Sequence, residues 1–439
     1  MATEKGKQDA AKQPKKSAEK AGGGSGGSNN SGPDYPSDNI RLGAAGPSMF
    51  NMAAGVGGLA LAAAAGLGSM EGDGFHRFSL SYLTAYMFVL AICLGALFWV
   101  TLQNLVNAHW SIVLRRVGEL LAAQAPLLGL LALPIVVPIF TGHSSIYIWS
   151  DAHAAEASHA LHKKAPYLNS SFFLVRFIVY FGFWTWLSRY FLNSSLAQDS
   201  SKDAPGIMAK MRATAGPAMI GWALTMTFCA VDLLMSLDPL WFSTIFGVYY
   251  LASCVLAVNS FLALTAMWLH KRGVLTKSVT TEHFHDLGKM MFAFTVFWAY
   301  IGFSQFMLIW YANIPEETGW FKERFVGGWF GGWGMLSATL LFGHFVIPFF
   351  GLLSRHIKRR RPTLAFWAVW QLLMVYLDMY WLVMPNTHAE APPFAIIDVA
   401  CLIGVLGVFI AGVAMRAKNL NLMPTGDPRL PKSLAFQNI

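Results

Sequence analysis

Two ionisable side chains, His344 and Asp378, fall deep inside long apolar runs of the sequence. A charged group inside a bilayer is costly, so such residues often mark a path for protons or ions. Neither has an obvious pairing group in its own run, although Asp378 stands between Tyr376 and Tyr380. Two interpretations stay open for them: a structural hydrogen bond to a neighbouring helix, or a step in a proton relay.

A further apolar run, about 287–313, has polar side chains at its start and in its interior. His285, Asp286 and Lys289 cluster at the start, and the i, i+3 spacing of the acid and the lysine places both on one helical face. Gln305 lies deeper, where its amide could hold a water chain. These features predict a proton path, although two separate structural networks would give the same pattern. Its candidates are His285, Asp286, Lys289, Gln305, His344 and Asp378.

Other charged residues near the apolar runs have simpler explanations. Asp232 is a carboxylate inside the apolar run at about 216–236, and Ser236 lies on the same helical face. Asp238 stands in a short turn before a proline, where capping the turn is as good an explanation as chemistry. Asp398 lies just inside a helix start, where a carboxylate suits the helix dipole. Arg189 is close to a helix end and can extend its charge to the surface.

The sequence contains no motif for a redox cofactor. The four cysteines stand singly inside apolar runs, without CxxC, CxxCH or iron–sulfur spacing. A bis-histidine haem needs two deep histidines on facing helices, and only His344 is deep. Walker A, Rossmann and HExxH patterns are absent from the sequence. We therefore expect this chain to bind no metal and no redox cofactor of its own.

The elements that must position these residues are long apolar helices. Of the 439 residues, 55% are hydrophobic and 13% are charged, against a charged fraction of about 25% in soluble domains. A spanning helix needs about 20 apolar residues, and its backbone must satisfy its own hydrogen bonds in lipid. The expected fold class is an all-α polytopic membrane protein with about ten transmembrane helices. The runs lie near 50–69, 78–101, 122–141, 172–192, 216–236, 241–268, 287–313, 330–353, 365–385 and 394–415.

Prolines and polar tails complete the expected organisation. Pro126, Pro134 and Pro138 predict kinks in the third run. Residues 1–48 are rich in Lys, Gly and Ser and predict a disordered tail without a cleavable signal peptide. Residues 416–439 form a second polar tail.

The basic residues give the fold a direction. Lys and Arg concentrate in the two tails and in every second loop, most densely at 355–361. By the positive-inside rule, both termini are expected in the cytoplasm. Two longer loops on the opposite face, about 142–171 and 314–329, suggest a docking partner there. The formal charge is +9, and the basic residues are distributed according to this topology. The sequence contains no nucleic-acid-binding motif, so we expect these residues to contact lipid headgroups and expect no nucleic acid as a partner.

Four stretches together resemble one family of membrane subunits. They are HWSIVLRRVGE at 109–119, YLNSSFFLVRF at 167–177, DLLMSLDPLWFSTIFGVYY at 232–250 and HDLGKMMFAFTVFWAYIGFSQFMLIWYANIPEETGW at 285–320. They are similar to the polysulfide-reductase-type, or NrfD-like, membrane subunits, and among these to subunits of alternative complex III, a quinol:cytochrome c oxidoreductase. The resemblance covers a transmembrane domain of about 49–415. It implies two four-helix bundles, about 78–236 and 241–385, flanked by two peripheral helices.

The resemblance also implies a role in a respiratory complex of the bacterial inner membrane. The implied partners are a paralogous NrfD-like membrane subunit, an iron–sulfur subunit and cytochrome c subunits. Their iron–sulfur clusters and haem c would carry electrons, while this chain would shape a quinol site, a transmembrane proton path or both. Quinol oxidation needs a base near the headgroup. The candidates near the expected periplasmic face are His143, Asp151, Arg176 and Asp232.

Two other classes of function stay open. A secondary transporter would use buried charges to couple its substrate, but transporters often interrupt helices in both halves, and here the prolines concentrate in the third run. A purely structural scaffold would pair its buried charges with one another. Co-purification with haem c and iron–sulfur subunits would separate the quinol-oxidising complex from both.

Overall fold

The computed structural model describes residues 38–73, 75–141, 146–151 and 159–438, and all regular elements in these residues are helices. Ten stretches are long and apolar enough to cross a membrane. This confirms the expected all-α polytopic membrane fold. In chain order the spans are α1 (Ala45–Met70), α2 (His76–Leu105), α3 to α5 (Ile112–Ala122, Ala125–Leu131 and Leu133–Thr141), α8 (Ser170–Gln198), α9 (Ala204–Leu233), α10 (Phe246–Lys271), α11 (Thr281–Ala312), α13 with α14 (Gly332–Thr339 and Ile347–Leu353), α16 (Arg361–Val383) and α17 (Ile396–Ala417).

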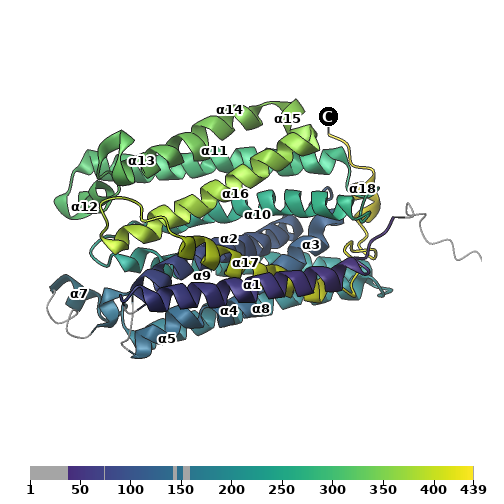
Figure 1. The fold of residues 1–439 in the computed structure, drawn as a ribbon. Coiled ribbons are helices and arrows are strands. Elements are labelled where there is room, and N and C mark those ends of the chain that lie inside the picture. The colour runs from purple at the N-terminus through teal and green to yellow at the C-terminus, as the bar shows by residue number, and fades with distance from the viewer. Residues whose placement is uncertain (1–37, 74, 142–145, 152–158, 439) are drawn as a thin grey trace, which may run out of the picture. The chain divides into compact units, whose positions relative to one another are not determined.

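The spans run back and forth between two ends of the helical unit (Figure 1). We call one end the terminus side, because the first and last described residues lie there. On this side the Leu422 amide donates to the Ile40 carbonyl (2.7 Å). The other end, which we call the loop side, carries the short helices α7 (His159–Lys164) and α12 (Pro315–Glu323).

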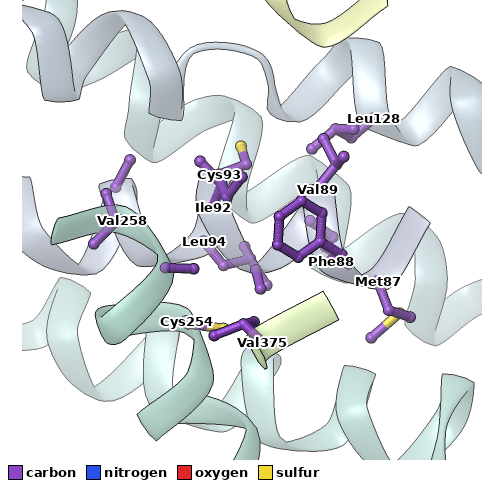
Figure 2. Close-up of a cluster of buried hydrophobic side chains, with 14 of the residues drawn as sticks. Met87, Phe88, Val89, Ile92, Cys93, Leu94, Leu128, Cys254, Val258 and Val375 are labelled. Atoms are coloured by element: carbon purple, nitrogen blue, oxygen red, sulfur yellow. The ribbon is translucent and has the colours of Figure 1, made fainter. Parts of the chain in front are cut away.

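Two helices, α2 and α10, form the centre of the unit and pack along one another. Nearly every side chain of α2 is buried, so this helix shows little amphipathic pattern. The two backbones approach closely at Gly95, where a Cβ atom would lie 2.1 Å from the Cys254 carbonyl oxygen. Figure 2 shows the apolar cluster in this region, which Leu128 of α4 and Val375 of α16 also join.

The other spans form two groups around this central pair. In the first group, α3 and α9 pack on α2, while α8 packs on α4 and α9. In the second, α11 and α16 pack on α10, and α14 packs on α11. The remaining helices, α1 and α17, pack against one another, and α17 lies against α2. These contacts agree with two four-helix bundles and two peripheral helices.

The regular α-helix is interrupted in two spans, in different ways. The third is divided into α3, α4 and α5, with Pro126 and Pro134 in the first turns of the later pieces and Pro138 inside α5, as their positions predicted. The eighth span widens into a π-helical turn at residues 340–346, just ahead of Pro348. Such turns are frequent at functional sites.

Parts of both tails pack on the terminus side, although the sequence predicted a tail through residue 48. The Asp38 carboxylate accepts hydrogen bonds from the Lys277 and Ser278 amides, both at 2.9 Å, and α1 begins at Ala45. The partners of this segment are distant in the chain, so its polar composition could not reveal them. Residues 1–37 lie outside the described residues.

A buried ionic network holds the C-terminal segment against α3. Arg115 and Arg116 lie inside this helix, not in the loop expected there, and their side chains are fully buried. Arg115 donates to Glu119 (3.0 Å) and to Asp427. Burial by itself raises the pKa of Asp427. The hydrogen bond from Arg429 and the positive charges of Arg115 and Arg429 outweigh this effect and lower the pKa below its usual value. The segment expected to be a free tail is therefore tied to the helices.

Candidate functional site

Asp378 of α16 is the centre of a polar cluster in the second group of helices. It is fully buried and accepts hydrogen bonds from the Tyr249 hydroxyl, from Ser253 Oγ (3.0 Å) and from Trp298 Nε1 (3.1 Å). Tyr249 and Ser253 lie one turn apart on α10, and Trp298 comes from α11. A buried carboxylate is tolerated when such donors replace water. Three helices therefore meet at this side chain.

An aromatic cavity of about 600 Å³ adjoins the cluster on the loop side. Tyr249 and Trp298, both bonded to Asp378, form part of its wall. Gln305, a candidate from the sequence, is another of the few polar wall residues. Most of the wall is aromatic and includes Phe246, Phe303, Phe306, Trp320, Phe321, Phe325, Trp329, Phe345 and Trp381. Concave apolar walls with a few polar groups are typical of small-molecule sites.

His344 lies behind the Trp298 ring. The two ring centroids are 3.9 Å apart and the planes are inclined by 28°. The imidazole is 0% exposed, and neither ring nitrogen has a hydrogen-bond partner within the described part of the chain. Burying such a group without a partner is costly, and His344 belongs to the π-helical turn of the eighth span. His344 therefore stacks on the same indole whose N–H donates to Asp378.

A polar pair continues from Asp378 toward the terminus side. Gln371, two turns away on α16, donates from Nε2 to Thr295 Oγ1 of α11 (2.7 Å). Both side chains are fully buried. Neither was a candidate from the sequence, because an uncharged polar residue in an apolar helix is not distinctive.

The predicted mouth of the proton path lies at the terminus-side start of α11. Asp286 and Lys289, which the i, i+3 spacing placed on one helical face, form an ion pair. His285 is largely buried, and Lys289 also donates to Asn438 Oδ1 (2.7 Å). The C-terminal segment thus contacts this mouth directly. The structure places it at a different depth from the Asp378 cluster, with the Gln371 pair between them.

Arg324 is a buried cation beside the aromatic cavity. It donates to the backbone carbonyls of Trp320 (2.9 Å), Trp381 (3.2 Å) and Leu382 (3.0 Å). Its guanidinium lies 3.5 Å from the Trp320 ring centroid. Burial lowers the pKa of Arg324 to about 9, so the group remains charged at neutral pH. The carbonyls belong to the last turns of α12 and α16, where a cation is favourable.

The two described candidates inside the first group of helices form a closed ion pair. Arg176 of α8 donates to both carboxylate oxygens of Asp232 on α9, at 2.8 and 3.0 Å, and the Tyr180 hydroxyl donates as well (2.8 Å). The guanidinium also stacks on the Tyr167 ring at 3.9 Å. Bidentate geometry of this kind satisfies both charges and ties α8 to α9.

The other two quinone-site candidates are Asp151 and His143. Asp151 is exposed on the loop side, and His143 lies outside the described residues. The simpler explanations for the remaining charges agree with the contacts. Asp398 accepts a hydrogen bond from the Ala395 amide (2.9 Å) at its helix start, and it also pairs with Arg77 of α2 (2.8 Å), which the sequence did not reveal.

Within the described part of the chain, no three His, Cys, Asp or Glu side chains are arranged to hold a metal ion. All four cysteines are free and buried. The absence of a redox cofactor in this chain stays a prediction from the sequence.

The sequence did not reveal the donors to Asp378, because the rotation of each helix about its axis decides which of its side chains face this carboxylate. Tyr249 and Tyr250 are adjacent and both are buried, but Tyr250 donates instead to the Met87 carbonyl of α2 (2.8 Å). A signal was available in the i, i+4 spacing of Tyr249 and Ser253, which puts two hydroxyls on one face. That signal needs the knowledge that this face meets the helix of Asp378.

Comparisons with known proteins do not identify a family. The chain matches no protein-family profile, and no curated protein matches it significantly.

Proposed function

We propose that this chain is an integral membrane subunit of a quinol-oxidising respiratory complex, and that its aromatic cavity binds the quinol headgroup. One observation carries the proposal. Two wall residues of the cavity, Tyr249 and Trp298, both hydrogen-bond to the buried carboxylate of Asp378. A quinol combines a flat aromatic ring, two hydroxyl groups and an apolar tail, and the cavity offers a counterpart to each.

The apolar part of the ligand is matched by the wall. Trp320, Trp381 and the wall phenylalanines supply faces and edges for offset or edge-to-face contacts with a ring. Phe303 of α11 and Leu341 of the π-helical turn line the cavity and are also exposed at the outer surface. An isoprenoid tail can leave toward lipid between these two residues.

Tyr249 and Asp378 supply the proton chemistry in this proposal. A headgroup hydroxyl donates to the Tyr249 oxygen while the Tyr249 proton moves along its hydrogen bond to Asp378. Tyr249 ends neutral, Asp378 ends protonated, and the quinol has lost one proton. The second follows after Asp378 passes on the first. Positioned proton acceptors contribute about 10²–10⁴-fold to such steps.

The two electrons leave to partner subunits, for which iron–sulfur clusters and haem c are the proposed carriers. The proposed partners are a paralogous membrane subunit, an iron–sulfur subunit and cytochrome c subunits in the bacterial inner membrane. The loop side, with the aromatic cavity, would face the periplasm. The distribution of Lys and Arg and the resemblance of residues 285–320 support this setting.

The test uses the adjacent tyrosines as a matched pair. The full chain, in lipid nanodiscs, is titrated with a short-tailed quinone while tryptophan fluorescence is recorded, because several tryptophans line the cavity. Tyr249→Phe is expected to weaken binding about fivefold, the value of one hydrogen bond. In the intact complex it should slow quinol oxidation about 100-fold. Tyr250→Phe should leave both unchanged.

Equal quinone binding by the wild type and Tyr249→Phe would remove the aromatic cavity from quinol chemistry. Purification of the native protein as a cofactor-free homo-oligomer, without haem c or iron–sulfur subunits, would instead favour a transporter or a structural scaffold.

A second candidate function, a proton path through the second group of helices, is favoured by the Gln371–Thr295 hydrogen bond. This pair lies between Asp378 and the mouth formed by His285, Asp286 and Lys289. Protons would then pass between the terminus side and Asp378. The two functions are compatible, because Asp378 can serve both.

A further inference from the structure

A second cavity, of about 360 Å³, lies on the loop side near the ends of α7 and α9. Its wall includes Lys163 and Lys164 from α7 and the rings of Tyr167, Trp241 and Phe242. We call it the lysine pocket. None of the described residues that form its wall is acidic. It is therefore suited to an anion.

The hydrogen-bond donors of the lysine pocket are only partly used. Lys164 Nζ donates to the Pro239 carbonyl and lies 5.5 Å from the Phe242 ring centroid. Burial lowers the pKa of Lys164, and the nearby Asp238 offsets part of this effect. Lys163 is exposed, whereas Trp241 is buried and its Nε1 has no partner among the described residues. Lys163 and the remaining donors of Lys164 can thus bind an acceptor-rich group such as phosphate.

An apolar track leads away from the lysine pocket along α9. Val231 and Met235 belong to the pocket wall. Phe228, Leu224 and Ile220 follow at spacings of three to four residues on the same helical face, and all three are exposed. The track points from the loop side into the apolar thickness of the unit. Tyr and Trp beside the charges match the side chains enriched at membrane interfaces.

From this combination we infer that the lysine pocket binds the phosphate group of an anionic phospholipid in the loop-side leaflet, with the acyl chains along the outward face of α9. A phosphate beside two lysines and apolar chains on a lipid-facing helix together match one amphipathic molecule. A Lys or Arg side chain near the surface of an anionic bilayer contributes about 1 kcal/mol to the attraction. The inference concerns a different site from the proposed quinol cavity and does not depend on it.

The test measures retention of phosphatidylglycerol by the full chain in mixed phosphatidylcholine nanodiscs, using native mass spectrometry after partial delipidation. Lys163→Gln is expected to lower the apparent affinity about fivefold, and the double variant with Lys164→Gln about 25-fold. Lys322→Gln is the control, because this exposed lysine lies on the same side but outside the pocket. It should bind like the wild type. Lys163→Gln leaves the bond from Lys164 to Pro239 intact.

Three results would overturn the inference. The first is equal phosphatidylglycerol retention by Lys163→Gln and the wild type, and the second is an equal loss in Lys322→Gln. The third is displacement of the bound lipid by millimolar inorganic phosphate as readily as by short-chain phosphatidylglycerol, which would assign the pocket to free phosphate.

Discussion

Asp378, Tyr249 and Trp298 form a unit in which each residue has a separate role. In the proposed function the carboxylate would accept protons. The phenol lies between it and the aromatic cavity, and the indole N–H occupies one carboxylate oxygen. Because the same carboxylate would serve both the proposed quinol site and the proposed proton path, variants of Asp378 cannot separate the two functions. A residue outside the cavity wall is needed for that purpose.

Gln371→Leu separates them. Thr295 keeps its hydrogen bond to the Met291 carbonyl (2.8 Å), so the change leaves no buried group of Thr295 unsatisfied and should preserve folding. If protons pass this point, fewer protons should be translocated per electron in proteoliposomes of the complex, while quinone binding stays at the wild-type level.

Gln124→Leu is the control for this experiment, since Gln124 is a buried glutamine of the first group that bonds only within its own span among the described residues. Unchanged proton stoichiometry in Gln371→Leu would contradict the path.

At the scale of elements, α10 connects the core of the unit to the site. One face packs on α2, where Gly95 lies against the Cys254 carbonyl, and the neighbouring Ser253 donates to Asp378. The close approach at Gly95 thus helps to set the rotation of α10 that directs Tyr249 toward α16. The π-helical turn has a similar effect in the eighth span, where it carries His344 beside Trp298.

Gly95→Ala is expected to destabilise the protein by about 1–3 kcal/mol, because the added methyl group must displace the backbone of α10. Thermal unfolding in detergent should show a lower Tm, and quinone binding should weaken although Gly95 does not line the cavity. Gly182→Ala in α8 is the matched control, since a Cβ atom there meets no other atom within 4 Å. A wild-type Tm for Gly95→Ala would show that α2 and α10 separate easily.

At the scale of the whole molecule, the two sides of the helical unit differ in chemistry. The terminus side holds the buried network of Arg115, Glu119 and Asp427, which ties the C-terminal segment to α3. The loop side holds the aromatic cavity and the lysine pocket. A ligand from either membrane leaflet therefore meets a different surface, and the orientation of the chain determines which compartment each surface faces.

The orientation can be measured by cysteine labelling, because the four native cysteines are buried and should give a low background. Lys322→Cys on the loop side should react with an impermeant maleimide added to intact cells. Lys202→Cys on the terminus side should react only after the membrane is permeabilised. The opposite pattern would reverse the positive-inside assignment and with it the compartment proposed for the aromatic cavity.

Much of the fold follows from local physics that a sequence expresses directly. Apolar run lengths predicted ten spans, since the thickness of the bilayer dictates the length of a helix. Pro126 and Pro134 predicted breaks because proline removes a backbone donor within its own turn. The shared helical face of Asp286 and Lys289 and the place of Asp398 at a helix start were predicted for a similar reason: each depends on residues within one helical turn.

The candidate site depends on contacts between helices that are distant in the chain. His344, Asp378 and Gln305 were candidates from the sequence, but Tyr249 and Trp298 became visible only when α10 and α11 were placed around α16. A helix presents one narrow face to each neighbour, so a rotation of about 100° exchanges Tyr249 for Tyr250. The apolar composition of a segment determines that it forms a helix in a membrane. Tertiary packing alone decides which of its side chains contact those of the neighbouring helices.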